Sequence, residues 1–265
     1  MQTTHHHTLW LSDIHLGNKD CKAEYLLTFL NSITVDTLYL VGDIVDMWQM
    51  SKQFRWPDAH NQVLHKFMQM SENGTRVVYL PGNHDAPLQS YSGMAFGNIE
   101  IMRQCVHTTL QGKRYLVLHG DQFDGDVTMG KFHSWLGDKG YDLLLFLNRW
   151  HNRFRHWRKR EYWSLAGYIK QHIKGANLAI SRYRAACCLY AKRLELDGVI
   201  CGHIHHPQSA VEDGIHYVND GDWVENCSAL SEDSEGNLTL VYFLTMHNNT
   251  NVTAIKTTTD ASQAA

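Results

Sequence analysis

A buried strand is predicted by the stretch Thr37-Leu38-Tyr39-Leu40-Val41-Gly42-Asp43-Ile44-Val45-Asp46, which runs from apolar residues into glycine and a carboxylate. A run of Leu, Tyr, Leu and Val is typical of a strand that is covered on both faces of a sheet. The Gly-Asp pair at its carboxyl end places Asp43 where α/β sheets form their sites. Gly-Asp at a strand end is also ordinary turn chemistry, so this stretch alone leaves both interpretations open.

Four further stretches place Asp, His or Asn directly after apolar runs of β character. They are Leu11-Ser12-Asp13-Ile14-His15-Leu16-Gly17, Leu80-Pro81-Gly82-Asn83-His84-Asp85, Leu116-Val117-Leu118-His119-Gly120-Asp121 and Val199-Ile200-Cys201-Gly202-His203-Ile204-His205-His206-Pro207. Residues two apart on an extended chain share a face, so both side chains of Asp-x-His or His-x-His reach one centre. A single pair of this kind usually consists of histidines that lie on the surface or pack in the core. Five such stretches in series indicate a functional site instead.

Strands and helices are predicted to alternate in the first part of the chain. Strands are expected at 9–14, at 37–43 and at 76–80, and helices at 22–33 and 58–73, an order that implies right-handed βαβ units. Residues 98–118 predict a hairpin with its turn at Gln111-Gly112, and 197–244 predict further strands and turns. We expect one metal-binding domain over 1–245 and a mobile polar tail over 246–265.

Composition narrows the class of protein. With 265 residues, of which 43% are hydrophobic and 11% aromatic, the chain can bury one sizeable core. We expect a cytoplasmic location, because the sequence predicts neither a signal peptide nor an apolar segment of about 20 residues. Six cysteines without a C-x-x-C pair fit a reducing compartment.

Residues 131–195 carry a charge opposite to that of the rest of the chain. They hold fourteen Lys or Arg and four Asp or Glu, a balance of +10, whereas ten basic and twenty-three acidic residues give −13 elsewhere. An aromatic stripe at helical spacing has a dense basic flank, and its residues are Phe146, Trp150, Phe154 and Trp157, flanked by Arg149, Arg153, Arg155, Arg158, Lys159 and Arg160. Such a stripe is usually core. The flank favours contact of 146–160 with an anionic membrane surface, on its inner face, and nucleic acid is an alternative.

The ordered motifs resemble a known family. The set Asp13-x-His15, Gly42-Asp43, Gly82-Asn83-His84-Asp85, His119-Gly120 and Gly202-His203-x-His205 is similar to the signature of the calcineurin-like metallophosphoesterases. This resemblance implies an α/β fold (α+β by some schemes), a four-layer α-β-β-α sandwich with a helical cap insertion at 131–195. The chain length, the His119-Gly120-Asp121 variant and the insertion before Gly202 resemble the UDP-2,3-diacylglucosamine pyrophosphatase branch of lipid A biosynthesis.

The resemblance also implies two divalent metal ions and a role for each motif. Asp13, His15, Asp43 and His205 would hold one ion, and Asp43, Asn83, His119 and His203 the other, with attack by a metal-bridging hydroxide. Oxygen and imidazole ligands without thiolate favour Mn²⁺, with Fe or Zn²⁺ as alternatives. His84 would stabilise charge or protonate the leaving oxygen, with Asp85 orienting its ring.

The substrate is less sharply predicted than the reaction. The branch typically has Arg at the positions of His84 and His206, whereas the basic insertion lies where the branch carries a lid for an acylated sugar nucleotide. The candidate substrate contacts are Asn83, His84, Asp126, Lys170, Lys174, Asn177, Arg182 and His206. UDP-2,3-diacylglucosamine or a similar nucleotide-linked lipid or sugar is the expected substrate, and a general phosphodiesterase or nuclease is the alternative. A non-catalytic scaffold would be expected to lose ligands, and this chain keeps them all.

Overall fold

Two sheets form the centre of the fold. The structure is a computed structural model that describes residues 3–124, 151, 155, 157–158 and 174–243. Within these residues the first sheet has seven strands in the order β12 (Leu238–Tyr242), β11 (Ser228–Glu232), β1 (Thr4–Leu11), β2 (Ile33–Leu40), β3 (Arg76–Tyr79), β5 (Ile99–Ile101) and β4 (Ala95–Phe96). The second sheet has five, in the order β6 (Gln104–Thr108), β7 (Arg114–Leu118), β8 (Gly198–Cys201), β10 (Ile215–Asn219) and β9 (Gln208–Glu212).

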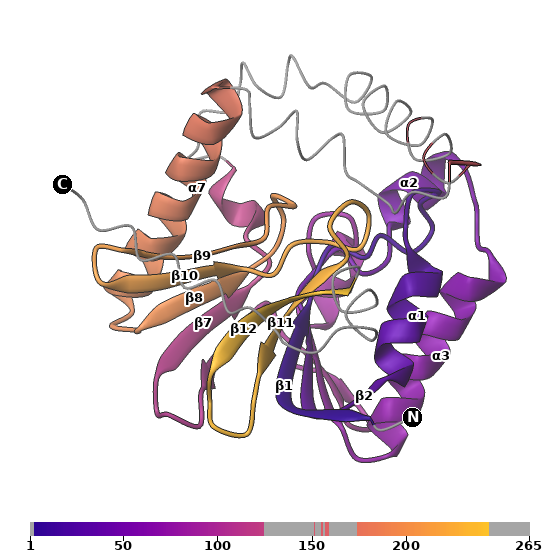
Figure 1. The fold of residues 1–265 in the computed structure, drawn as a ribbon, viewed down its shortest axis with the longest axis horizontal. Helices are drawn as coiled ribbons and strands as arrows, with labels where there is room; N and C mark the ends of the chain where they lie inside the picture. Colours follow the sequence, from indigo (N-terminus) through magenta and orange to yellow (C-terminus); the bar gives the residue numbers. More distant parts are fainter. Residues whose placement is uncertain (1–2, 125–150, 152–154, 156, 159–173, 244–265) are drawn as a thin grey trace.

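Helices cover the outer face of each sheet, so the molecule has four layers (Figure 1). Helices α1 (Ala23–Asn31) and α3 (Asp58–Glu72) pack on the first sheet, and α7 (Lys174–Arg193) packs on the second. Trp10, Tyr39 and Val78 of the first sheet meet Val117 and Ile200 of the second in a buried cluster between them. The predicted α-β-β-α sandwich is confirmed.

Parallel pairing brings the carboxyl ends of several strands to one edge. In the first sheet β1 pairs in parallel with β2, and β2 with β3, with Leu11 opposite Leu40 and Leu40 opposite Tyr79. In the second sheet β8 pairs in parallel with β7 and with β10. The loops after these strands carry the predicted site residues, and three short helices begin in or near them: α2 (Met47–Lys52), η1 (Ala86–Tyr91) and η2 (Asp121–Phe123).

Three sequence predictions need correction or stay open. The first strand begins at Thr4 rather than at residue 9, because His6 and Thr8 are buried and the strand pairs with β2 from Thr4 onward. The hairpin predicted over 98–118 begins only at Gln104, because 99–101 pair in parallel with β3 in the other sheet. The tail 246–265 lies outside the described residues.

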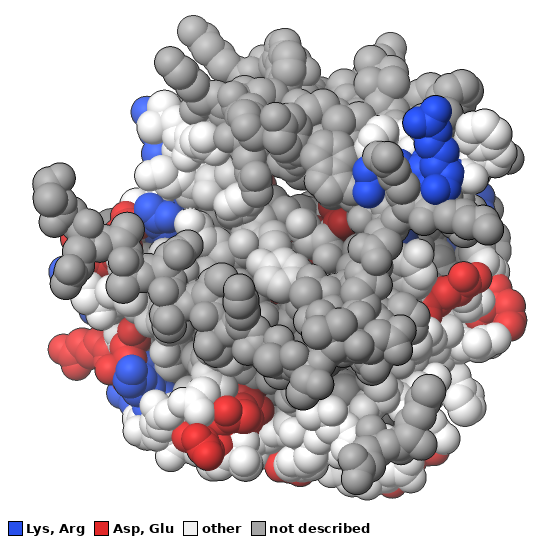
Figure 2. Space-filling view, viewed as in Figure 1, with Lys and Arg blue, Asp and Glu red and all other residues white. Residues whose placement is uncertain are grey.

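The last third of the predicted cap insertion is α7, which is a layer of the sandwich itself. Most of 131–173 lies outside the described residues. Among the described residues, the molecule has no helix with the length and apolar character needed to cross a membrane. Figure 2 shows a cluster of described Lys and Arg side chains on this face at the upper right, where Figure 1 places α2 and the short described pieces between residues 151 and 158. Described Asp and Glu side chains lie mostly in the lower half of the view.

Candidate metal centre

The backbone is left-handed at the ends of β1, β2 and β8. In the described ranges, five of the eight non-glycine residues with positive φ are Asp13, His15, Asp43, His203 and His205, with φ between 50° and 71°. Such a conformation costs about 1–3 kcal/mol per residue and persists where the surrounding structure holds it in place. Its concentration at five predicted ligands indicates that this edge of the sheets is built for a function.

Glycines allow the loops to approach one another closely. A Cβ atom on Gly42 would lie 2.2 Å from His119 Nδ1, and one on Gly82 would lie 2.4 Å from Asp43 Oδ1. A Cβ atom on Gly202 would lie 2.4 Å from Asp13 Oδ2. The Gly-Asp, Gly-Asn-His-Asp and Gly-His-x-His motifs therefore need glycine because a side chain would displace a neighbouring site residue.

One group of candidate ligands consists of Asp13, His15 and His205. His205 Nε2 lies 3.2 Å from Asp13 Oδ1 and 3.3 Å from His15 Nε2. Asp13 Oδ2 accepts a hydrogen bond from the His203 backbone N–H at 2.8 Å, whereas its Oδ1 atom is buried and has no hydrogen-bond partner among the described residues. This oxygen and the two facing imidazole nitrogens converge on one point, as the ligands of a cation do.

A second group consists of Asp43, His119 and His203, with Asn83 beside it. His119 Nδ1 donates a hydrogen bond to the Val41 carbonyl at 2.9 Å, so in the neutral ring, the form that binds a metal ion, the lone pair is on Nε2. This Nε2 atom lies 3.4 Å from Asp43 Oδ2 and 3.3 Å from Asn83 Oδ1. The structure thus brings all seven predicted metal ligands to one place, in two groups.

The electrostatics of the cluster suit divalent cations. Asp13, Asp43 and Asp46 are at most 2% exposed, and burying several carboxylates together is costly unless positive charge is near. Burial alone would raise the pKa of Asp43, but His119 and His15 hold it below its ordinary value. Burial would lower the pKa of His119, but Asp43 raises it well above its ordinary value. The site therefore attracts positive charge, and its carboxylate, amide and imidazole donors match Mn²⁺, Fe or Zn²⁺.

Asp46 is a site residue that the sequence predictions missed. Its carboxylate accepts hydrogen bonds from His84 Nδ1 at 2.8 Å and from His15 Nδ1 at 3.2 Å. It also caps α2 by accepting from the Gln49 N–H at 2.8 Å, and it accepts from Asn18 Nδ2 at 3.3 Å. One feature of the sequence could have identified Asp46: it stands three residues after Asp43 and directly before a helix, where Asp is a common N-cap.

Asp85 does not orient the ring of His84, and this prediction was wrong. Its buried carboxylate accepts from the backbone N–H groups of Gly82 at 2.6 Å, Ile44 at 2.9 Å and Asp43 at 3.3 Å, and from the Tyr79 hydroxyl at 2.5 Å. Burial and the nearby Asp43 raise the pKa of Asp85. Asp85 therefore ties the loop after β3 to the loop after β2, and Asp46 orients the histidine.

The predicted substrate contacts fall into three sets. Asn83 and His84 lie at the metal centre, and His206 directly follows the His-x-His pair and is partly buried. Asn177 and Arg182 are exposed residues of α7, and their contact with a substrate stays a prediction. Asp126, Lys170 and the side chain of Lys174 lie outside the described residues.

Asp124 is a second acidic residue near the metal centre that the sequence predictions did not include. Its Oδ1 atom lies 2.9 Å from His203 Nε2.

Comparison with known proteins agrees with this geometry. The model of the calcineurin-like phosphoesterase family matches residues 6–207. A UDP-2,3-diacylglucosamine hydrolase from Photorhabdus laumondii is 26% identical over 216 residues, covering 76% of this chain and 82% of the relative. One from Shewanella baltica is 27% identical over 244 residues, covering 86% and 94%.

A solved structure titled as a novel archaeal phosphodiesterase covers 89% of this chain and 98% of its own, at 13% identity and a TM-score of 0.44. That similarity is too weak to inform the function. The family model, in contrast, spans every motif of the metal centre from Asp13 to His205. The chain belongs to the calcineurin-like phosphoesterase family.

Proposed function

We propose that the protein hydrolyses a phosphoester or pyrophosphate bond with the help of two divalent metal ions, and that Mn²⁺ is the preferred metal. The observation that carries this proposal is the position of Asp43 between the two ligand groups. Its Oδ2 atom lies 3.4 Å from His119 Nε2 and 3.9 Å from His15 Nε2. Asp13, His15 and His205 would hold one ion, Asn83, His119 and His203 the other, and Asp43 both.

When bound, the two ions supply an acidified water and positive charge for the phosphoryl oxygens. The protein itself supplies His84. Its Nδ1–H is held by Asp46, so Nε2 is the atom left for a substrate, and the side chain is 23% exposed. Burial lowers the pKa of His84, but the hydrogen bond to Asp46 and the charge of Asp43 raise it above its ordinary value. A protonated His84 would stabilise negative charge or donate a proton to the leaving oxygen.

We propose a nucleotide-linked lipid or sugar as the substrate, with UDP-2,3-diacylglucosamine as the first compound to test. Relatives named as hydrolases of that compound match 76% and 86% of this chain. The basic balance of residues 131–195 is consistent with an anionic substrate. A phosphodiesterase or nuclease would use the same metal centre and differ in substrate alone.

The test is a Mn²⁺-dependent screen of purified protein against UDP-2,3-diacylglucosamine, short UDP-sugars, single-stranded nucleic acid and bis-p-nitrophenyl phosphate. Turnover of the UDP-lipid is expected, and it should be lost in Asp43→Asn, because a shared ligand without its charge holds both ions poorly. The matched control is Asp213→Asn, the same change at an exposed residue whose φ of 50° is close to the 54° of Asp43. Cleavage of nucleic acid or the simple diester without the UDP-lipid would establish the alternative.

We also propose that 146–160 brings the enzyme to an anionic membrane surface. Trp157 is 76% exposed and lies between Arg155 and Arg158, whereas Phe146, Trp150 and Phe154 lie outside the described residues. Each basic residue near such a surface contributes about 1 kcal/mol. Changing both arginines to Gln should therefore weaken binding to anionic liposomes by about 2 kcal/mol, or about thirtyfold.

Liposome sedimentation at low salt measures this effect. The control is the double change of the exposed Arg103 and Arg114 to Gln, which removes the same charge from another part of the molecule. Equal loss in both double variants, or no binding by the wild type, would refute the membrane proposal.

A further inference from the structure

The connection between β10 and β11 crosses from the second sheet to the first at the edge that holds the metal centre. It comprises residues 220–227 and follows Asn219, the last residue of β10. The sequence predicts a turn here, because Asn-Asp-Gly is typical turn chemistry. None of these residues belongs to the ligand groups described above, yet all of them except Asn226 are buried. Buried polar side chains of this kind have partners that explain their burial.

His203 and His205 need support from outside their own loop. Both are left-handed, with φ of 71° and 50°. Residues other than glycine persist in this conformation where the surrounding structure holds them in place. One support is Asp13, whose Oδ2 atom accepts from the His203 N–H at 2.8 Å. The carbonyl groups at the two ends of the segment, those of Gly202 and His205, are held by two asparagines at the ends of the β10–β11 connection.

Asn219 holds the carbonyl group of Gly202. It is fully buried, and its Nδ2 atom donates to this carbonyl at 2.6 Å. Its Oδ1 atom accepts from the Gly221 N–H at 3.0 Å. Because a backbone N–H can only donate, the atom that faces Gly221 is the oxygen, and the amino group is left for Gly202. Asn219 is also paired with Cys201 in the sheet, so its side chain lies directly beside the start of the Gly-His-x-His motif.

Asn226 holds the carbonyl group of His205. Its Nδ2 atom donates to this carbonyl at 3.3 Å and also to the carboxylate of Asp222. Both neighbours are acceptors, so the amino group is the part of the amide that faces them. Asp222 is fully buried and closes the turn by accepting from the backbone N–H groups of Val224 at 2.7 Å and Asn226 at 3.2 Å. This turn fixes the direction in which the Asn226 amide points.

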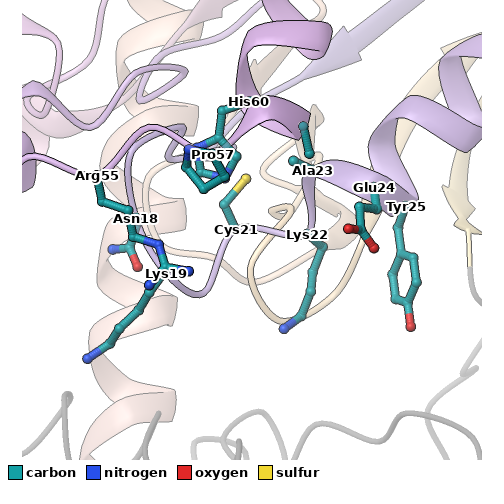
Figure 3. Close-up of a pocket in the computed structure, with 11 residues that line it drawn as sticks. Asn18, Lys19, Cys21, Lys22, Ala23, Glu24, Tyr25, Arg55, Pro57 and His60 are labelled. Atoms are coloured by element: carbon teal, nitrogen blue, oxygen red, sulfur yellow. The ribbon is translucent and has the colours of Figure 1, made fainter.

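The same connection is fixed to the first sheet. The Trp223 N–H donates to the Asp13 carbonyl at 3.1 Å, and the Trp223 carbonyl accepts from the Lys22 N–H at 2.8 Å. Lys22 directly precedes α1, in the wall of the cavity drawn in Figure 3. The Ser12 hydroxyl donates to Asp220 Oδ1 at 2.6 Å. The connection therefore contacts the loops of ligands from both sheets.

We propose that Asn219 and Asn226 are positioning residues of the metal centre, whose amides hold His203 and His205 in the conformation that turns both rings toward it. The proposal rests on the two-metal centre proposed above. Without either amide, the loop would relax in the metal-free protein, and metal binding would have to restore the strained conformation. Asn226 acts on His205 alone, so its loss should weaken only the ion in the group of Asp13. Asn219 acts before both histidines, so its loss should weaken both ions.

The experiment is calorimetric titration of the metal-free full-length chain with Mn²⁺, with the bound ions counted by electron paramagnetic resonance. Asn226→Ala should weaken one of the two ions about tenfold and leave the other within about twofold. Asn219→Ala should weaken both about tenfold. Because the readout is metal binding, the result does not depend on which substrate the protein hydrolyses.

The chain offers a matched control for Asn226→Ala. In the β11–β12 turn, Asn237 bonds to Asp233 as Asn226 bonds to Asp222, with the side-chain Nδ2 and the backbone N–H each donating at 2.9 Å. This turn lies away from the ligand loops, so Asn237→Ala should leave both Mn²⁺ affinities unchanged.

The control for Asn219→Ala is Asn98→Ala, which removes an Nδ2 bond to the Ser71 carbonyl at 3.1 Å, before β5. Thermal unfolding of the metal-free proteins shows which variants are folded. Asn226 is only partly buried, so Asn226→Ala should fold even if Asn219→Ala does not.

Three results would overturn the positioning role. Mn²⁺ affinities equal to those of the controls would do so and leave the two-metal centre standing. Weakening of both ions in Asn226→Ala would indicate general disruption of the site rather than the orientation of His205. Absence of Mn²⁺ binding by the wild type would overturn this proposal and the two-metal centre together.

Discussion

At the scale of single residues, Asp46 holds two histidines of the metal centre in place. One carboxylate accepts from four donors, namely the ring nitrogens of His15 and His84, the Gln49 N–H and the Asn18 amide. Asp46→Asn would turn an N–H₂ group toward donors, so the histidine rings would lose their orientation. We expect metal affinity to fall about 10- to 100-fold, the range for a lost partner of a metal-binding histidine.

Metal titration and thermal unfolding of the same variant check this prediction. The lost helix cap alone should cost about 1 kcal/mol of stability. Asp58→Asn, at the exposed start of α3, is the control for replacing an acid at a helix start. A variant that is only less stable, with metal affinity unchanged, would show that Asp46 serves as a cap and nothing more.

His84 permits a second prediction at this scale. His84 also forms a third possible ligand group, with His15 and Asp46, but its Nδ1 atom donates a hydrogen bond to Asp46 there, so we expect His84→Ala to leave the metal content intact. The rate should fall about 10²- to 10⁴-fold, as for a lost general acid. Metal analysis and steady-state kinetics measure the two effects, with the exposed His65→Ala as control. Loss of one ion would make His84 a ligand instead.

At the scale of elements, α7 presses against the glycine that follows the ligand His119. Gly120 has φ of +110°, and a Cβ atom there would lie 1.8 Å from the Tyr183 hydroxyl of α7. Gly120→Ala should therefore cost about 3 kcal/mol or more, from the left-handed backbone and from the displaced tyrosine. Urea unfolding gives the loss in free energy.

The turn between β6 and β7 offers a control for the backbone part of that cost. Gly112 has φ of +79°, and a Cβ atom added there would have no neighbouring atom within 4 Å, so Gly112→Ala should cost only about 1 kcal/mol. Tyr183→Phe moves the nearest atom back to the ring carbon, 3.0 Å away. Gly120→Ala should cost less in that background, and strict additivity would show that the tyrosine is not the obstacle.

At the scale of the whole molecule, a buried hydrogen-bond chain joins the two sheets. Glu232 of β11 accepts from His107 Nε2 of β6 at 2.9 Å and from the Leu110 N–H at 2.8 Å, and it is fully buried. His107 Nδ1 in turn accepts from the Tyr39 hydroxyl of β2 at 3.3 Å. Glu232→Gln would set an N–H₂ group against a donor, and we expect a loss of about 1–3 kcal/mol at neutral pH.

The same pair gives a pH dependence with a defined sign. Burial works to raise the pKa of Glu232, but the hydrogen bonds from His107 and Leu110 bring it below its ordinary 4.5. A carboxyl with a lowered folded-state pKa stabilises the fold above its unfolded pKa, and this stability is lost as the pH falls through the folded value.

The difference in unfolding free energy between wild type and Glu232→Gln should therefore be constant above about pH 5 and shrink below about pH 4.5. Urea unfolding across this range measures it, with Glu72→Gln, at an exposed end of α3, as the control. A difference that grows on acidification would contradict the assigned sign.

The sequence by itself determined the fold class and the list of metal-binding candidates. An apolar run followed by Gly-Asp or Gly-His indicates a buried strand and then a turn. The strand and the turn are each encoded by residues that are neighbours in the sequence. For this reason the ends of β1, β2, β3, β7 and β8 were found, and with them Asp13, Asp43 and His119. The order of the motifs was enough to indicate the family.

Only the tertiary structure decided which residues support these side chains. Asp46 and Asp85 both stand near a ligand in the sequence, and no local pattern tells which carboxylate meets His84, because the choice depends on how the loop after β2 folds against the loop after β3. The strand at 99–101 was predicted to be part of a hairpin, but it pairs with β3 in the first sheet. The alternation of apolar and polar residues indicates which side chains are buried, but it does not indicate the partner strand. Burial is encoded locally, whereas hydrogen-bond partners are set by chain segments that meet only in the folded state.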